Sequence, residues 1–335
     1  MTSADRAAKF GHTALPDEQR DALKRAVQLE WTTVGVLVVT VTLMFLVLGS
    51  SQAMRAAWVE DMLSFLPPIA FLVATRIIRR PPTEDHPYGF HRATGIGHLV
   101  AAAALLVMGA YLIVDSGSKL LTAEHPTIGG IEIFGHTVWL GWLMIATLAV
   151  TSIAPVLLGR AKLKLSETLH DKVLYADADM NKADWTTGVA AIAGILGIGI
   201  GWWWADSVAA LLISLSIVRD GLRNVKGAVA ALIDTRARTY DEHEAHPLSD
   251  RIDDHLTGLA WVAEARSRVR DEGHVFHVES FVVPANGSMP SLQELEQARS
   301  ECVHLDWKVQ DMVIVPTAEL PGEFLPGLAA SGGER

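Results

Sequence analysis

Long apolar stretches alternate with short charged segments over the first two thirds of the chain. A transmembrane helix needs roughly 20 largely apolar residues, and six stretches come close to that length. The predicted spans are residues 31–49, 57–78, 95–121, 133–158, 174–203 and 205–222. The second and the fifth are imperfect because each carries acidic residues at one end. The pattern predicts an α-helical membrane protein with six transmembrane helices.

The positions of lysine and arginine predict how these helices are oriented. Basic residues gather before the first span, between the second and third, between the fourth and fifth, and after the sixth. The opposite side shows little beyond Arg55 and Lys119. Because loops rich in lysine and arginine stay in the cytoplasm, we expect both termini to be cytoplasmic, in a bacterial inner membrane.

After about residue 226 the chain becomes charged and rich in histidine. The pattern predicts a helix over residues 240–257, a β-hairpin turning at 271–273, a second helix from Leu292 to Cys302 and a strand from Val309 to Val315. This order, αββαβ, predicts a cytoplasmic α+β domain. The expected boundaries are a cytoplasmic tail over 1–27, a transmembrane domain over 28–228, a soluble domain over 229–320 and a disordered tail over 321–335.

Composition narrows the class of protein. Half of the 335 residues are hydrophobic, which is too many for an ordinary soluble domain. The net charge of −10 speaks against a nucleic-acid partner, and the single cysteine, Cys302, excludes an intrachain disulfide and a Cys-rich zinc site. The chain has no nucleophile–base pair, phosphate loop or dinucleotide fingerprint. We therefore expect neither an enzyme nor a resident cofactor.

One acidic cluster opens the second predicted span, in "WVEDMLSFLPP". Glu60 and Ser64 are four residues apart and share a helix face, while Asp61 points about a quarter-turn away. Pro67 and Pro68 follow, and they should kink the helix and free backbone carbonyls nearby.

A second cluster, "YADADMNKADW", opens the fifth span. Asp177, Met180, Asn181 and Asp184 fall on one helical stripe. An ionised acid in the membrane costs at least ~2.5–3.5 kcal/mol, so several together need a counter-charge. A divalent cation held between two helices would supply it. Asp184, the deepest of the acids, is the preferred metal ligand.

Other acids near the spans have structural interpretations. We expect Asp177 and Asp179 at the cytoplasmic interface, solvated or capping the helix, with Asp179 and Lys182 facing water or each other. Asp206 follows a tight turn and is expected to be the N-cap of the sixth helix.

At this point the chain resembles the cation diffusion facilitator family. The loop "RRPPTEDHPYGFHRAT" is similar to the family's "RPPDxxHPYGHGRxE", and "LYADADMNKAD" resembles its fifth-helix signature "LxADAxHxxSD". Six helices followed by a soluble domain of about 90 residues complete the likeness, which covers roughly residues 28–318.

The resemblance implies a divalent metal cation efflux transporter, working as a homodimer by cation/proton antiport with alternating access. Its soluble domain would be ferredoxin-like and would form the dimer. The family's metal site, between helices two and five, falls on Glu60, Ser64, Met180 and Asp184, and Asp61 is a candidate replacement for Ser64. This set suits Fe²⁺, Mn²⁺, Co²⁺ or Ni²⁺ better than tightly held Zn²⁺.

The family's second metal site lies in the loop between spans two and three. Asp85, His86 and His91 could form it here, but a loop whose histidine and glycine only set a turn is an equal alternative.

Candidate metal sites in the soluble domain are weaker. The positions that bind metal in zinc-responsive members are Ala265, Ser280 and Val315 by spacing, and none is a ligand. His274 and His277 should lie on opposite faces of a strand, so we do not expect a joint site. His243 and His246 suit a solvated helix start.

A different class of function stays open. Two of the four family ligands are lost, which fits a transport-inactive membrane scaffold or regulatory relative. A transporter requires Glu60, Asp61 and Asp184 to converge on one wet cavity, whereas a scaffold would pair these acids with cations or bulk water.

Overall fold

The computed structural model describes residues 15–324, except positions 81, 124, 126, 134, 135, 242 and 274. At positions 179, 182–184 and 323 it describes the backbone alone. Two compact units result. The bundle unit is Glu18–Arg76 with Thr94–Ala230, and the C-terminal unit joins Ile77–Ala93 and Met1–Asp17 to Ala231–Arg335. The expected tail structures at residues 1–14 and 325–335 lie outside the described residues.

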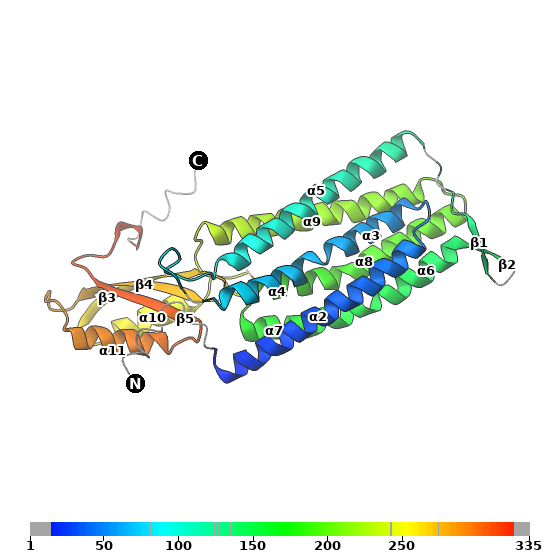
Figure 1. The fold of residues 1–335 in the computed structure, drawn as a ribbon. Coiled ribbons are helices and arrows are strands. Elements are labelled where there is room, and N and C mark those ends of the chain that lie inside the picture. Colours follow the sequence, from blue (N-terminus) through cyan, green and yellow to red (C-terminus); the bar gives the residue numbers. More distant parts are fainter. Residues whose placement is uncertain are drawn as a thin grey trace. The chain divides into compact units, whose positions relative to one another are not determined.

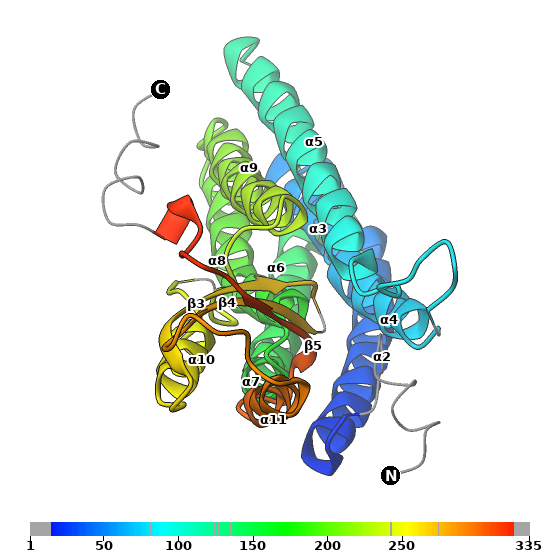
Figure 2. The ribbon, with the colours of Figure 1, turned by 90° about the vertical axis from the view of Figure 1, so that its left-hand side faces the viewer.

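Long helices running alongside one another make up the bundle unit (Figure 1), and Figure 2 shows them closer to end-on. They are α2 (Asp17–Leu46), α3 (Gln52–Leu63), α4 (Leu66–Ile78), α5 (Ala93–Leu121), α6 (Leu140–Thr151), α7 (Ile153–Leu169), α8 (Lys172–Gly199) and α9 (Ala205–Leu232).

Four helical stretches among the described residues are long and apolar enough to cross a membrane. They are Asp17–Leu46, Gln52–Ile78, Ala93–Leu121 and Leu140–Leu169, and α8 adds a shorter apolar stretch, Trp185–Gly199. These four overlap the first four predicted spans.

The second span is broken where its prolines predict a kink. The Ser64 amide donates to the Glu60 carbonyl at 2.9 Å and ends α3. Pro67 and Pro68 then lie in the first turn of α4, where a helix needs no N–H donors. The predicted distortion is therefore a full break between two helices.

The fourth span was predicted to begin at residue 133, which is earlier than the helix begins in the structure. Residues from Ile133 to Trp139 belong to a hairpin of β1 (Gly130–Ile133) and β2 (His136–Trp139), and the helix begins at Leu140. Polar residues such as Glu132 and Thr137 pair across the two strands. Their backbone groups are satisfied in a ladder, which the apolar residue count could not reveal.

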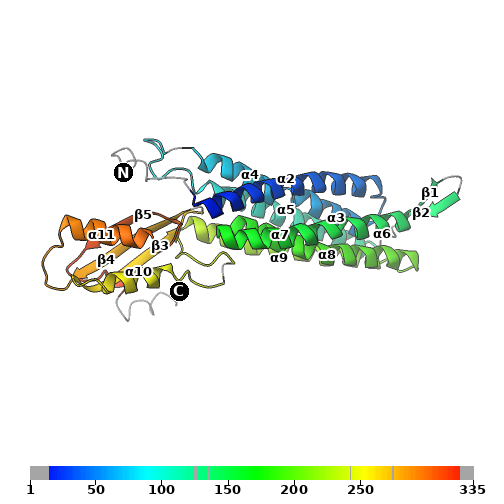
Figure 3. The same cartoon turned by 90° about the horizontal axis from the view of Figure 1, so that it is seen from below.

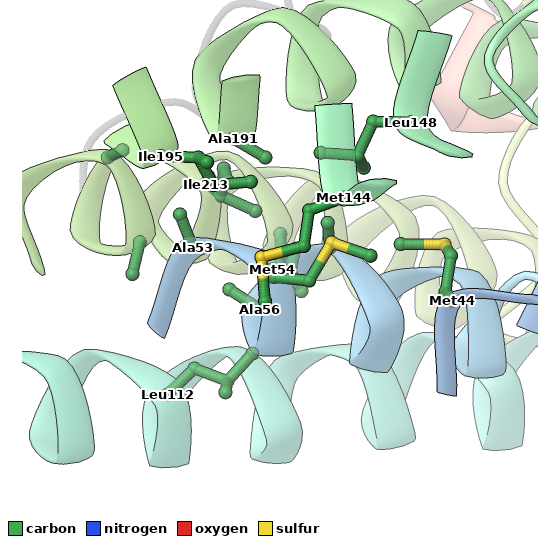
Figure 4. Close-up of a cluster of buried hydrophobic side chains, with 14 of the residues drawn as sticks. Met44, Ala53, Met54, Ala56, Leu112, Met144, Leu148, Ala191, Ile195 and Ile213 are labelled. Carbon is green, nitrogen blue, oxygen red and sulfur yellow. The ribbon is translucent and has the colours of Figure 1, made fainter. Parts of the chain in front are cut away.

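An apolar core of methionine, alanine, leucine and isoleucine holds the bundle together. Met44, Met54 and Met144 are each at most 1% exposed and lie among side chains from α3, α5, α6, α8 and α9 (Figure 4). Small residues allow close helix approach. A Cβ at Gly221 of α9 would lie 2.9 Å from the Leu106 backbone nitrogen on α5.

The C-terminal unit has the predicted order αββαβ. Its elements are α10 (Leu248–Thr257), β3 (Val262–Asp271), β4 (Phe276–Pro284), α11 (Leu292–Val303) and β5 (Val309–Pro316), followed by the short helix η1 (Gly322–Phe324). The sheet order is β3-β4-β5, with the first pair antiparallel and the second parallel (Figure 3).

Both helices of the C-terminal unit cover the same face of this sheet. Ile252 and Leu256 of α10 and Ala298 of α11 form one core with Phe276 and Val278 of β4. The first helix begins at Leu248, later than the sequence interpretation placed it, directly after a proline.

Candidate metal site

Glu60 and Asp61 line a small cavity inside the bundle unit. The cavity measures about 20 Å³, enough for roughly one water molecule or a bare ion. It lies among α2, α3, the α6–α7 junction and α8, and is lined by Met44, Ala57, Glu60, Asp61, Leu148, Thr151, Ser152, Pro155, Thr187 and Gly188. Two of the three acids predicted to converge, Glu60 and Asp61, therefore line one cavity beside α8.

The Glu60 carboxylate points toward α8. Thr187 of α8 hydrogen-bonds to this side chain, whereas Oε2 is buried and has no hydrogen-bond partner among the described residues. A buried carboxylate oxygen without a donor is unfavourable unless a proton or a cation occupies it. Glu60 is thus chemically suited to hold a cation.

Two of the family positions have other roles in this structure. The Ser64 hydroxyl donates to the Glu60 carbonyl at 3.1 Å, which stabilises the end of α3. Met180 is half-buried and packs against the apolar core. Neither arrangement presents a strong ligand atom to a cation, so the oxygens of Glu60 and Asp61 are the better donors.

Asp184 lies in the part of α8 whose side chains are not described. The backbone places it three and four residues before Thr187 and Gly188, on the helix face that lines the cavity. At Gly188 a Cβ would lie 2.3 Å from Ser152 Oγ, so α8 approaches the α6–α7 junction closely at this point. Asp179 and Lys182, expected near the cytoplasmic rim, also lie outside the described side chains.

The loop residues do not gather into a metal site. Asp85 and His86 are exposed, and the His86 ring stacks on Phe90 at 4.6 Å. His91 is buried, and this burial lowers the pKa of its imidazole. Within the described parts of the chain, no group of three His, Cys, Asp or Glu residues is placed to hold a metal ion.

Asp177 is not at a solvated interface, as the sequence interpretation had favoured. It is 4% exposed and pairs with Lys162 of α7, whose Nζ also lies 3.0 Å from Glu30 Oε2 on α2. We name Glu30, Lys162 and Asp177 the charge triad. The expectation was wrong because α2 packs against the first turn of α8, where Ala22 and Ala26 share a buried apolar cluster with Leu174.

Asp206 is a cap, but for a different helix than predicted. It lies in the first turn of α9, is fully buried, and accepts from the Ser51 hydroxyl at 2.6 Å. It also accepts from the backbone amides of Gln52 and Ala53 at the start of α3. Long-range pairing of this kind has no signal in local sequence.

One further acid escaped the sequence interpretation. Asp220 of α9 lies close enough to Glu60 to interact with it electrostatically, and it pairs with Arg223 at 2.9 Å. Its position inside the predicted sixth span, two residues before the end of that span, was the available signal.

The described histidines of the C-terminal unit have separate surroundings. His274 lies outside the described residues, while His277 is paired with Asp311 at 2.7 Å. His243 is exposed as predicted, but His246 is half-buried against Phe276 and accepts from the Leu248 amide.

Comparison with known proteins places this arrangement in context. Residues 31–233 match the family model for the cation efflux transmembrane domain. Manganese efflux system protein MneS of Bacillus subtilis is 25% identical over 219 residues, covering 65% of this chain and 71% of that protein. Cation-efflux pump FieF of Shewanella oneidensis is 25% identical over 225 residues, covering 67% and 72%. Putative transporter MamV of Paramagnetospirillum magneticum is 24% identical over 326 residues, covering 86% and 92%.

Proposed function

The chain belongs to the cation efflux family, and from that membership we propose that it exports a divalent metal cation across a membrane. Relatives named as a manganese efflux system and a cation-efflux pump support this function. The chemistry is transport alone, with no covalent step and no resident cofactor, because the metal ion is the cargo.

The proposed architecture has six spans, with α8 and α9 as the fifth and sixth, and both termini in the cytoplasm of a bacterial cell. The bias of lysine and arginine supports this orientation. The C-terminal unit is proposed to be a ferredoxin-like domain that joins two copies into a homodimer. Its αββαβ order supports that proposal.

The proposed transport site uses Glu60, Asp61 and Asp184, with Ser64 and Met180 as weak neighbours. One observation carries it: Glu60 lines a cavity between α3 and α8, and one of its buried carboxylate oxygens has no donor among the described residues. Carboxylate oxygens suit Mn²⁺ better than soft metals. Mn²⁺ is therefore the first candidate, ahead of Fe²⁺, Co²⁺, Ni²⁺ and Zn²⁺.

Antiport follows from competition at these carboxylates. A metal ion requires deprotonated ligands, so binding it releases protons and releasing it allows protons to return. Alternating access would then exchange one cation for protons in each cycle.

A transport-inactive scaffold or regulatory subunit is the second candidate. The Ser64 hydroxyl donates to a carbonyl of its own helix, and Met180 packs against the apolar core. Structural contacts of this kind at two of the four family positions are expected if metal binding has been lost.

The test is metal uptake into proteoliposomes under an imposed pH gradient, with Mn²⁺, Fe²⁺, Co²⁺, Ni²⁺, Zn²⁺ and Cd²⁺ compared. Wild type is run beside Glu60→Gln, Asp184→Ala and, as a matched control, Glu264→Gln on the exposed side of β3. The exporter predicts uptake by wild type and the control, and loss in both site variants. Folded protein that moves no ion would favour the scaffold.

A further inference from the structure

The charge triad brings two acids and one lysine together from three helices of the bundle unit. Glu30 lies on α2, Lys162 on α7 and Asp177 on α8. Lys162 Nζ contacts Asp177 Oδ2 and lies 3.0 Å from Glu30 Oε2. The exposed fractions of Glu30, Lys162 and Asp177 are 0%, 0% and 4%. The triad is therefore a buried ionisable group for which the proposed metal site has no use.

The formal charges of the triad do not balance. Two ionised carboxylates and one ammonium leave one negative charge uncompensated, and an uncompensated charge in a buried site is strongly unfavourable. Among the described residues, Asp177 and Lys162 are the charged groups that act on Glu30. One bound proton would make the triad neutral.

The contacts of the two acids indicate which of them carries that proton. Asp177 accepts from Lys162 at Oδ2 and from Asn181 Nδ2 at Oδ1, the latter over 3.0 Å, so both of its oxygens are satisfied in the ionised form. Neither oxygen of Glu30 accepts a hydrogen bond with good geometry from the described residues, although Lys162 Nζ lies nearby. Glu30 is therefore the acid that lacks donors.

Glu30 and Asp177 also lie within hydrogen-bonding reach of each other. Two ionised carboxylates repel each other at that range, and neither has a hydrogen to donate. A protonated Glu30 can instead donate its O–H to the ionised Asp177. The proton thus removes a repulsion and supplies a hydrogen bond at the same place.

The packing of α2 separates this proton from water. Glu30 continues the buried stripe of α2 that begins with Ala22 and Ala26. Those two alanines share an apolar cluster with Leu169 of α7 and Leu174 of α8. An ionised Glu30 requires hydration, so its deprotonation favours the separated helices and its protonation favours the packed ones.

We propose that the charge triad is a proton-binding site separate from the metal carboxylates, in which Glu30 carries a proton while α2 packs against α7 and α8 and releases it when that contact opens. Release breaks the O–H bond of the Glu30 carboxyl group, leaves a carboxylate and transfers the proton to water. The inference rests on the proposed function, because this proton would be part of the exchange for the metal cation.

Helix α8 connects the proton site to the metal site. Asp177 lies in its second turn, and Thr187 and Gly188, which line the metal cavity, follow on the same continuous helix. A displacement of α8 away from α2 therefore also displaces one wall of the metal cavity.

The first experiment detects protonated carboxyl groups in the purified protein by infrared difference spectroscopy at about pH 7, where exposed carboxyl groups are ionised. The variants are Glu30→Gln and Asp177→Asn, and the matched control is Glu18→Gln, at an exposed position near the start of α2. Glu30→Gln should lose one carbonyl absorption of a protonated carboxyl group that wild type and the control retain. Asp177→Asn should lose it too, because an ionised Glu30 then forms a neutral pair with Lys162.

The second experiment counts the protons moved for each Mn²⁺ in proteoliposomes. Glu30→Gln should move one proton fewer than wild type and Glu18→Gln, since a glutamine side chain cannot titrate. The melting temperature in detergent should also fall less with rising pH in Glu30→Gln than in wild type. Folded wild type keeps a proton that the unfolded chain releases, and such a group loses stability as the pH rises.

An infrared absorption unchanged in both Glu30→Gln and Asp177→Asn would mean that Glu30 is ionised in the folded protein, and would overturn the inference. An unchanged proton count in Glu30→Gln would overturn the exchange of this proton during transport. If Glu30→Gln does not fold, the absorption in Asp177→Asn decides. Wild type that moves no metal ion would instead contradict the proposed function, while the infrared result would still decide the proton site.

Discussion

At the scale of single residues, Asp206 links two helices that are far apart in sequence. The N-terminus of α3 has free amides and a partial positive charge. Ser51 caps one of these amides, that of Met54, at 3.1 Å. Asp206 of α9 accepts from the amides of Gln52 and Ala53 and from Ser51 itself. The start of α3 is therefore completed by another helix.

Replacing Asp206 with alanine should destabilise the bundle unit by roughly 2–3 kcal/mol, since a cap and charge-assisted hydrogen bonds are lost together. Ser51→Ala removes one hydroxyl and should cost about 1 kcal/mol. Thermal unfolding in detergent would measure both. An equal loss of stability in Asp206→Ala and Ser51→Ala would argue against the capping of α3 by Asp206 of α9.

His277 provides a pH dependence in the C-terminal unit. Its hydrogen bond to Asp311 raises the pKa of the imidazole, against the opposing effects of burial and of Arg270. Glu279 lies 3.4 Å from Nε2 and Glu272 also faces it. Because the folded pKa is raised, the stabilisation is complete below the unfolded value of about 6.5 and is lost as pH rises through the folded pKa.

The melting temperature of the C-terminal unit should therefore fall as pH rises above about 6.5 in wild type, and fall less in Asp311→Asn. Asp253 contributes separately to the pH dependence of stability, since burial raises the pKa of its carboxyl group to about 6. The stabilisation from its protonated form is lost as pH rises from 3.8 to about 6, and this loss is common to both proteins. Identical pH profiles for wild type and Asp311→Asn would contradict the role given to His277.

The acidic residues of α3 could be identified as candidate ligands from the sequence, whereas the partners of buried charged residues could not. Glu60 and Asp61 were identified because acids in an apolar stretch are costly. Lys162 was counted among loop cations, although it lies on the helical stripe of Pro155, Gly159 and Ser166 that is buried in α7. Its pairing with Glu30, far away in the sequence, depends on tertiary packing.

At the scale of elements, α5 and α9 pack through glycines. A Cβ at Gly221 would meet the Leu106 backbone at 2.9–3.1 Å, and one at Gly109 would lie 2.8 Å from a Val218 methyl group. Backbone atoms of a neighbouring helix cannot shift to accommodate an added Cβ as a flexible side chain can. This crossing therefore depends on the absence of side chains at both positions.

Gly221→Ala should destabilise the bundle unit by about 1–3 kcal/mol through overpacking. Gly117→Ala on α5 is the control, because its Cβ would meet only a Leu211 methyl group at an ordinary 3.9 Å. That variant should be neutral or slightly stabilising, since alanine favours helix. Unfolding of both proteins in detergent would compare them, and equal stability would refute the close crossing.

Element type was more predictable than element boundary. Pro67 and Pro68 marked the break in the second span, and the αββαβ order followed from alternation and turn residues. The hairpin at Gly130–Trp139 was missed because Ile131, Ile133 and Val138 read as part of an apolar span. The periodicity of hydrophobic residues alone does not distinguish a short apolar strand from the start of a helix.

At the scale of the whole molecule, each unit has its own apolar core. The core of the C-terminal unit contains Ile252, Phe276 and Val278, all fully buried. Ile252→Ala should lower the stability of that unit by roughly 2–4 kcal/mol and leave the bundle unit's melting unchanged. Calorimetry of the intact protein should show one transition shifted, and a shift of both would mean that the units unfold together.

One contact in the bundle unit has a mechanical consequence. Separating the start of α3 from α9 would break three hydrogen bonds to the buried Asp206 carboxylate, which is costly in a low-dielectric interior. We therefore expect the first half of the second span, with Glu60 and Asp61, to move together with α9. Beyond the break at Ser64, α4 is joined to α3 by only a short turn. In a conformational change we therefore expect the break at Ser64 to be the place where the angle between α3 and α4 alters.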